Sequence, residues 1–433
     1  MQKILILSYY FPPCNLTASY RVKSWAEYLN EFGFYPIIVT RRWDIEVTQI
    51  SDISAPSENK IIHQKNEKYE VYYLPYHQNL RDKIYYKYKE NQLVKVRKIL
   101  SLFEIIFPNW IISINPFRNL YYFSKKLIKK DADIKFLISS GSPFILFKFC
   151  YRLNKKLGIS WIADYRDEWN TSQWEKKVSI LKSFIKKIEL ISEKKWVKTA
   201  AFAIATSKIS AEKISKFVGC SAKVLYNGFV EEDFNNKVSK INNNNEFTFV
   251  YNGTLYDLQP LEIFAEAFKR IVKEYSDKLK IKIIFAGLGL NKKQQNRVEN
   301  LLKGYESNYI VTGRLPKKDI IEIQLQSHVL LLLALGERKG VIASKLFEYL
   351  ACGKTILFCP SDNGEMEELL KPTNLGVFCN NKEECYDSIK ILFDEYIENK
   401  ELKVFPDETV IKSYTRRIQT KNLADMIKNY ILK

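Results

Sequence analysis

The stretch Gly340-Val-Ile-Ala-Ser-Lys-Leu-Phe-Glu-Tyr-Leu-Ala-Cys-Gly353 decides the fold that we expect for this chain. It follows residues 329–334, an apolar run that is short enough for a buried parallel strand. From Ser344 the apolar residues recur with helical spacing, which makes Ser344 a candidate N-cap and Gly353 a candidate C-terminal stop. The sequence therefore predicts a strand, a loop and a helix. In parallel α/β sheets ligands bind beyond the carboxyl ends of the strands, where helix N-termini attract phosphate.

Lys345 and Glu348 are the candidate functional side chains of this stretch. Lys345 lies in the first turn of the predicted helix, where a cation is unfavourable unless an anion is bound. Glu348 follows about one turn later on the same side. A cation for a diphosphate and a carboxylate for sugar hydroxyls would together bind a nucleotide-sugar. The alternative is a solvated Lys/Glu pair on an amphipathic helix, and this stretch alone does not separate the two.

Composition excludes several classes of protein. A chain of 433 residues is long enough for two or three domains, and 46% hydrophobic residues argue against a disordered chain. The formal net charge of +19 favours anionic partners such as nucleic acid, an acidic membrane or a phosphorylated substrate. The 7 cysteines show neither CxxC nor zinc-finger spacing, so we expect reduced, mostly buried thiols in a cytoplasmic protein. No apolar segment is long enough to cross a bilayer.

A strand and helix alternation runs along the whole chain and is typical of two doubly wound α/β sheets. The strands that we expect are 3–7, 35–40, 71–74, 135–139, 161–164, 202–206, 223–226, 247–251, 281–286, 309–313, 329–334, 355–358 and 376–378. The polar, low-complexity segment 236–246 is the predicted linker. We thus expect a first Rossmann-like domain at 1–235, a second at 247–410, and a final helix over 411–432 by which 411–433 packs back on the first.

Two basic segments, about 81–130 and 176–198, interleave lysines with aromatic residues. Such segments suit helices in an anionic membrane interface. Solvated helices whose lysines merely cover apolar surface explain them equally well.

The chain resembles the retaining glycosyltransferases of the GT-B fold, specifically the GT4-like group that builds bacterial surface polysaccharides. The resemblance covers nearly the whole chain. The matching motifs are 9–13 with Arg21, 139–143, 163–169, 226–229, 251–254, 312–314 and 339–354. It implies two Rossmann-like domains facing across a cleft. It also implies transfer of a sugar from a nucleotide diphospho-sugar to a lipid-linked or growing glycan, at the cytoplasmic face of the inner membrane, for capsule, O-antigen or exopolysaccharide synthesis.

The resemblance assigns roles to residues of both domains. Lys345 would neutralise the leaving diphosphate and Glu348 would bind the ribose hydroxyls, while a donor phosphate oxygen takes the acceptor proton. The remaining candidates for catalysis or for positioning the sugar or the acceptor are Asp164, Arg166 and Asp167. The further candidates for substrate binding are Asn15, Thr17, Arg21, Ser142, Gly253, Thr254, Arg314, Gly340, Val341, Ile342 and Ser344. Simple capping by Asn15 or Thr17, and an Asp/Arg salt bridge within 164–167, are the structural alternatives.

Three departures from the family pattern concern the site. Gly340 stands where the first glutamate of an E-x7-E motif is expected, Phe144 stands where many relatives carry a histidine, and the usual basic pair near Gly253 has no match. Arg314 is the candidate substitute for that pair. No metal is expected, since Asp131-Ala-Asp133 precedes a strand rather than ending one. The partial glycine motif at 287–289 is too short to predict a dinucleotide cofactor.

Two other functions stay open at this point. The chain could be a catalytically degenerate partner that only binds a sugar nucleotide, because the glutamate and the histidine are missing. It could also be a basic nucleic-acid-binding protein, although the sequence shows no motif of that class.

Overall fold

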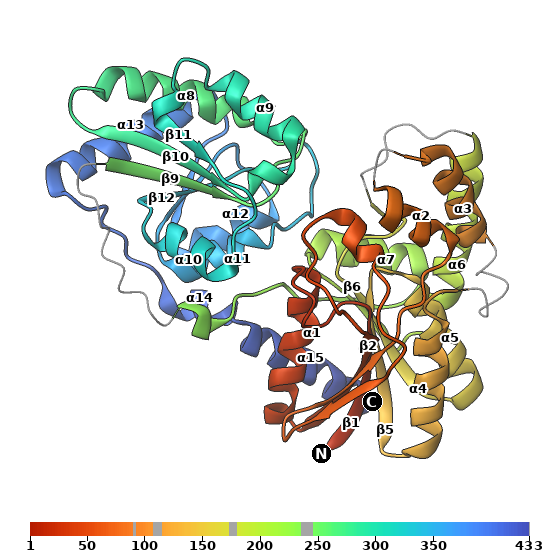
Figure 1. Cartoon of the computed structure of the whole chain (residues 1–433). Helices are drawn as coiled ribbons and strands as arrows, with labels where there is room; N and C mark the ends of the chain where they lie inside the picture. Colours follow the sequence, from red (N-terminus) through yellow and green to blue (C-terminus); the bar gives the residue numbers. More distant parts are fainter. Residues whose placement is uncertain (90–91, 107–114, 173–179, 235–245, 433) are drawn as a thin grey trace. The chain divides into compact units, whose positions relative to one another are not determined.

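The computed structural model of the chain (Figure 1) describes residues 1–89, 92–106, 115–172, 180–234 and 246–432. The chain divides into two compact units. Unit 1 comprises Met1–Tyr226 and Gln419–Lys433, and unit 2 comprises Asn227–Ile418. The predicted linker 236–246 lies outside the described residues except for Glu246, which begins a strand.

Unit 1 is built on an eight-stranded sheet. Its order is β3 (Ile62–Lys65), β4 (Glu70–Leu74), β2 (Phe34–Arg41), β1 (Gln2–Ser8), β5 (Ile134–Gly141), β6 (Ser160–Tyr165), β7 (Phe202–Ala205) and β8 (Ala222–Val224). Neighbouring strands are parallel except β3, which pairs antiparallel with β4. Strand β3 was not predicted, because all but one of its residues are exposed and polar, as an edge strand allows.

The helices of unit 1 include layers on both faces of this sheet. They are α1 (Ala18–Tyr28), α2 (Leu80–Tyr88), α3 (Val94–Ile106), α4 (Arg118–Lys130), α5 (Ile145–Leu157), α6 (Ile180–Val197) and α7 (Lys208–Val218), together with most of α15 (Arg416–Ile431). Buried residues of α4, α5 and α7 share one core with Leu5 and Leu7. Residues of α1 and α15 share the opposite core with Ile4 and Ile6 (Figure 1). The end of the chain thus packs into unit 1.

Unit 2 is built on a six-stranded, fully parallel sheet. Its order is β11 (Tyr309–Val311), β10 (Lys280–Ala286), β9 (Glu246–Asn252), β12 (Val329–Leu332), β13 (Thr355–Phe358) and β14 (Gly376–Phe378). Its helices are α8 (Leu261–Tyr275), α9 (Lys292–Leu301), α10 (Lys317–Leu325), α11 (Lys345–Cys352), α12 (Glu365–Leu370), α13 (Lys382–Asn399) and α14 (Glu408–Ser413). The expected α/β class with two Rossmann-like parallel sheets is confirmed.

Short 3-10 helices complete the described elements. They are η1 (Leu29–Phe32), η2 (Ile50–Ser54), η5 (Glu231–Phe234), η6 (Leu288–Leu290), η7 (Glu306–Asn308) and η8 (Lys371–Thr373). Helix α1 is followed directly by η1, which ends at Gly33 with φ +91°.

The single helix predicted over 411–432 is wrong, because the chain is interrupted between α14 and α15. The N–H of Phe229 donates to the Tyr414 carbonyl at 3.2 Å, and the N–H of Arg416 donates to the Phe229 carbonyl at 2.8 Å. These backbone groups form hydrogen bonds between the segment at Phe229 and the segment at 414–416. They are therefore not available to continue a helix.

The basic segments form helices where they are described. The first contributes α2, α3 and α4, and the second contributes α6. Residues 107–114 and 173–179, which carry part of the predicted apolar and aromatic surface, lie outside the described residues. Within the described ranges, no helix is both long and apolar enough to cross a membrane.

Candidate functional site

Helix α11 begins at Lys345 and positions the two side chains that the sequence singles out. Leu346, Phe347 and Leu350 are fully buried and fix its inner face against the sheet. The helix ends at Gly353, whose φ of +64° is the left-handed conformation of a C-terminal stop. Ser344 occupies the N-cap position, but its hydroxyl makes no capping hydrogen bond.

The ammonium group of Lys345 is buried without a hydrogen-bond acceptor among the described residues. It lies 3.7 Å from the centroid of the Tyr251 ring, so a cation–π contact is its main stabilising contact. Burial lowers the pKa of Lys345 to about 7, and the nearby Glu348 carboxylate raises it only in part. The ammonium group therefore has no hydrogen-bonded anion among the described residues.

Glu348 lies one turn further along α11 and has polar neighbours. Burial raises the pKa of its carboxyl, whereas the positive charges of Lys317, Arg416 and Lys345 lower it. The side-chain amide of Asn252 donates to Glu348 Oε2 at 3.4 Å. The backbone N–H of Asn252 also donates to the Tyr349 hydroxyl at 2.9 Å, which joins the end of β9 to α11.

Two glycines, Gly253 and Gly287, leave the backbone near Lys345 without side chains. Gly253 follows β9 with φ +85°, and Gly287 follows β10 with φ +84°. A Cβ atom on Gly253 would lie 3.9 Å from the Lys345 ammonium nitrogen, and one on Gly287 would lie 3.8 Å from the Cα of Gly253. The loops after β9, β10 and β12 therefore meet at α11, at the carboxyl edge of the sheet, where parallel α/β sheets bind ligands.

The other residues predicted for this unit lie in the loops after β9, β11 and β12. Gly340 is buried with φ +83°, Ile342 is buried and Val341 is half-buried. Ser344, Thr254 and Arg314 are exposed. Tyr251 and Asn252 were not predicted as site residues, although both belong to the motif at 251–254. Lys317 and Arg416, whose charges act on Glu348, were not predicted either.

In unit 1, Arg21 and Asp164 form a buried ion pair. The Nε of Arg21 donates to Asp164 Oδ1 at 3.0 Å, and its Nη2 lies 2.9 Å from the same oxygen. Ser140 donates to Asp164 Oδ2 at 2.7 Å. Arg21 Nη1 also donates to the carbonyls of Leu225 and Tyr226, at 3.1 and 3.2 Å. Neither side chain is more than 4% exposed.

A second pair lies on the surface of the same unit. Arg166 donates from Nε and Nη2 to Asp167 Oδ2, at 3.1 and 2.7 Å, and lies 5.5 Å from the centre of the Tyr10 ring. This contact is the loop salt bridge that we considered for residues 164–167. The Asp167 side chain is 62% exposed and remains accessible.

The three remaining candidates of unit 1 lie in loops at strand ends. Asn15 accepts from the Val47 N–H at 3.1 Å and donates to its carbonyl at 3.4 Å. Thr17 is exposed and makes no side-chain capping bond at the start of α1, and Ser142 is half-buried after β5. Simple helix capping thus explains neither Asn15 nor Thr17.

Comparison with known proteins bears directly on the loop and helix around Lys345. Residues 232–429 match the family described as Glycosyl transferases group 1. Over these residues the chain is similar to a glycosyltransferase group 1 domain. Lys345, Glu348 and the glycine loops described above all lie within this match. No curated protein sequence matches the chain.

Solved structures of similar fold cover the chain almost completely. The UDP-forming trehalose-phosphate synthase of Burkholderia xenovorans is 11% identical, with a TM-score of 0.63 and 100% coverage of both chains. The sucrose-phosphate synthase of Thermosynechococcus elongatus is 12% identical, with a TM-score of 0.59, and covers 100% of this chain and 97% of its own. Anabaena HepE, solved with UDP and glucose, is 12% identical, with a TM-score of 0.53, and covers 98% and 95%. At these identities the likeness shows the fold, which is GT-B.

Proposed function

We propose that the chain is a retaining glycosyltransferase that moves a sugar from a nucleotide diphospho-sugar to a lipid-linked or growing glycan acceptor. The observation that carries the proposal is the buried ammonium group of Lys345, which lies at the N-terminus of α11 and has no hydrogen-bond acceptor in the part of the chain that the structure describes. Burying an unpaired cation is costly, so such a group is retained where a ligand supplies the counter-charge.

The geometry suits stabilisation of a departing diphosphate. As the bond between the sugar C1 and the phosphate oxygen breaks, its electron pair stays on the diphosphate. Lys345 and the N–H groups at the start of α11 would stabilise that charge. The acceptor hydroxyl would attack C1 from the same face and pass its proton to a phosphate oxygen. This order of bond breaking, attack and proton transfer needs no nucleophilic side chain from the protein.

Glu348 is proposed to bind the ribose. Its carboxylate lies one turn beyond Lys345 and already accepts from Asn252, so it can accept hydroxyl protons next to a bound diphosphate. The structurally similar proteins support uridine as the base, since HepE was solved with UDP and with UDP-glucose, and the Escherichia coli trehalose-6-phosphate protein with UDP-2-fluoro glucose. We therefore propose a UDP-sugar donor.

We also propose that the transfer needs no metal cofactor, because Lys345 and the helix N-terminus supply the positive charge that a metal ion supplies elsewhere. Chelation by EDTA is expected to leave turnover unchanged. A return of activity on adding Mg²⁺ or Mn²⁺ after EDTA treatment would contradict this part of the proposal.

A thermal-shift and calorimetric screen against nucleoside diphosphates and their sugars tests the proposal. A ligand at a hundredfold excess over its dissociation constant stabilises the folded state by about 2.7 kcal/mol. Lys345→Ala and Glu348→Ala are expected to remove the shift. Lys278→Ala is the matched control, because Lys278 is an exposed lysine 5.0 Å from the centre of the Tyr275 ring in the same unit. If no nucleotide shifts the wild-type protein, the proposal fails.

The retained rival is a degenerate partner that binds the donor without turning it over. The absence of a glutamate at Gly340 favours it. Hydrolysis of the UDP-sugar by water in the absence of acceptor separates the two functions: hydrolysis that Lys345→Ala abolishes supports the enzyme. Tight binding with neither hydrolysis nor transfer supports the partner.

Helix α3 is the surface that we propose to lie on the anionic inner membrane, where a lipid-linked acceptor for capsule, O-antigen or exopolysaccharide synthesis would be found. Val96, Ile99 and Phe103 lie on one side of α3 and are exposed. Lys95 and Lys98 flank them and are also exposed. An apolar face bordered by lysines fits an interface of acyl chains and anionic headgroups.

Flotation with phosphatidylglycerol vesicles tests this surface. We expect binding at low salt that phosphatidylcholine vesicles do not give and that Ile99→Asp with Phe103→Asp abolishes. Ile391→Asp is the control, because Ile391 is an exposed apolar residue of α13 in unit 2. Equal flotation of both variants would remove the membrane proposal.

A further inference from the structure

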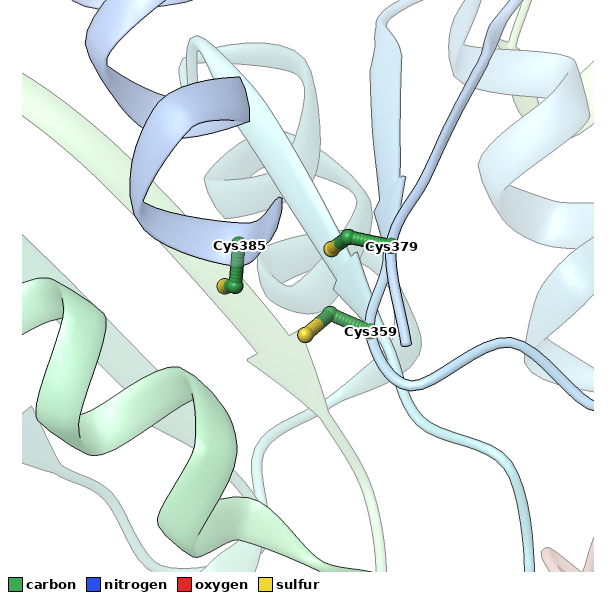
Figure 2. A group of neighbouring side chains, drawn as sticks. All are labelled: Cys359, Cys379 and Cys385. Atoms are coloured by element: carbon green, nitrogen blue, oxygen red, sulfur yellow. The ribbon is translucent and has the colours of Figure 1, made fainter. Parts of the chain in front are cut away.

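Three cysteines that are separated along the chain come together inside unit 2. The sulfur atoms of Cys359, Cys379 and Cys385 all lie within 4.8 Å of one another. Figure 2 shows the three side chains approaching one another from separate segments of the chain. All three are fully buried, with 0% of their surface exposed.

The fold explains how these positions meet. Cys359 directly follows β13 and Cys379 directly follows β14, and these strands are parallel neighbours at one edge of the sheet. The Cys379 N–H donates to the Phe358 carbonyl at 3.2 Å, which sets the two ends side by side. Cys385 comes from the first turn of α13, where its N–H donates to the Asn381 carbonyl at 3.0 Å.

The three thiols interact with one another. The Cys379 thiol is within hydrogen-bonding reach of both Cys359 and Cys385. By contrast, Cys352 of α11 is a buried thiol of the same unit that donates instead to Gln324 Oε1 at 3.5 Å.

We propose that Cys359, Cys379 and Cys385 bind one thiophilic metal ion. Thiolates are soft ligands that select Cu⁺ and Zn²⁺ over hard cations. With metal–sulfur bonds of about 2.3 Å, three sulfurs around one ion are about 4 Å apart, which is compatible with sulfur atoms that all lie within 4.8 Å of one another. Little rearrangement of the backbone is then needed.

The donor set favours Cu⁺ over Zn²⁺. Within the described residues no other histidine, cysteine or acidic side chain shares the cluster. Structural Zn²⁺ almost always takes four ligands, whereas three thiolates in a dry environment can complete the shell of Cu⁺. The bound ion would tie the ends of β13 and β14 to the start of α13, so it would stabilise unit 2 without touching Lys345 or Glu348.

The test uses the full chain, purified and reduced with a phosphine and then loaded with Cu⁺ from a chromogenic chelator or with Zn²⁺. We expect one Cu⁺ per chain after desalting, a higher melting temperature, and an X-ray absorption spectrum with three sulfur neighbours. One Zn²⁺ with the same three sulfur neighbours supports the site and changes the preferred ion.

Variants decide whether these thiols are the ligands. Cys359→Ser, Cys379→Ser and Cys385→Ser are each expected to lose the ion and the metal-dependent rise in melting temperature. Cys352→Ser is the control and is expected to keep both. Absorption spectroscopy of the wild type keeps the test valid where a variant folds poorly. Absence of stoichiometric metal in the wild type, a spectrum without sulfur neighbours, or equal loss in Cys352→Ser would overturn the proposal.

Discussion

The ammonium group of Lys345 lies 3.7 Å from the centre of the Tyr251 ring, with no hydrogen-bond acceptor among the described residues. Tyr251 is the penultimate residue of β9 and Lys345 is the first residue of α11, so this contact joins the end of a strand to the start of a helix at the carboxyl edge of the sheet. A ring face stabilises a cation only weakly compared with a phosphate. The contact thus holds the Lys345 ammonium group in a position where a bound diphosphate can replace the Tyr251 ring as its partner.

Replacing Lys345 by methionine is expected to separate binding from stability. The variant keeps the length of the side chain and loses its charge, so nucleotide-dependent turnover should fall by about two to three orders of magnitude. The ligand-free protein should become more stable at neutral pH, because the cost of burying an unpaired cation is removed. Turnover and urea denaturation are measured on the same preparation, with Lys278→Met as control. A less stable variant would show that Lys345 serves the fold instead.

The stability gain of Lys345→Met should depend on pH in a defined direction. Burial lowers the folded-state pKa of Lys345 to about 7 from its usual value of 10.5. Between these two values the unfolded wild type binds more protons than the folded one, so its stability rises with pH relative to the variant. The gain should therefore be largest below pH 7 and disappear towards pH 10.5. Chemical denaturation across this range measures it, and a gain that does not change with pH contradicts the lowered pKa.

Diphosphate binding should take up a proton above neutral pH. A bound anion restores the charged form of Lys345, whose pKa is about 7 without ligand. Affinity should then fall with rising pH, by at most about tenfold per unit. Calorimetry in buffers of different ionisation enthalpy at about pH 8.5 counts the protons. Lys345→Arg stays charged and should take up none, so equal uptake by both proteins would assign the proton to another group.

Glu348→Gln should weaken binding of nucleosides but not of pyrophosphate. The carboxylate is proposed to accept from ribose hydroxyls, and hydrogen bonds to charged groups contribute about 1.5–3 kcal/mol. UDP affinity should fall roughly tenfold or more by that measure. Competition assays with both ligands test this, with Glu322→Gln on the exposed side of α10 as control. If Glu348→Gln weakens both ligands equally, its carboxylate acts on the diphosphate end.

Gly253→Ala should affect the ligand more than Gly33→Ala does, although both impose similar backbone strain. Gly253 has φ +85° and Gly33 has φ +91°, and a side chain there costs on the order of 1–3 kcal/mol. The new methyl group on Gly253 would lie 3.9 Å from Lys345 Nζ, whereas nothing lies within 4 Å of one on Gly33. We expect the two variants to have equal melting temperatures. Only Gly253→Ala is expected to lose nucleotide affinity.

The predicted strands of both sheets were found because parallel strands are buried on both faces and appear in the sequence as apolar runs. Most of these strands begin or end within one or two residues of the predicted bounds. Strand β3 is an exposed edge strand and lacks that signal. Helix α13 was not predicted, although Cys385, Ile389 and Phe393 recur along it at intervals of four residues. Its apolar positions are separated by charged residues, so no apolar run marks them.

Only part of the candidate site could be predicted from the sequence. Lys345 and Glu348 are neighbours on one helix, and helical periodicity is enough to pair them. Their contacts with Tyr251 and Asn252 come from a strand far away in the chain, and no local pattern encodes them. The cysteine cluster is missing from the sequence analysis for the same reason, since its spacing matches no metal motif. The Arg21–Asp164 pair, whose partners are 143 residues apart along the chain, belongs to this class as well.

Substitution of Asp164 by asparagine is expected to act mainly on stability. The carboxylate is fully buried, pairs with Arg21 and accepts from Ser140. Removing one partner of a buried pair leaves the other uncompensated and costs about 3–5 kcal/mol. Arg21→Met should cost a similar amount, and the double variant should cost less than the sum because neither charge remains alone.

A catalytic role for Asp164, which the sequence resemblance suggested, leads to a different outcome. Turnover of the UDP-sugar is measured well below the melting temperature of each variant, alongside urea denaturation. If the pair is structural, folded Asp164→Asn keeps nearly full turnover and loses only stability, and Asp167→Asn on the exposed surface changes stability little. If Asp164 acts on the sugar or the acceptor, turnover falls by orders of magnitude at almost unchanged stability. Because the carboxylate is buried and fully paired, we expect the first outcome.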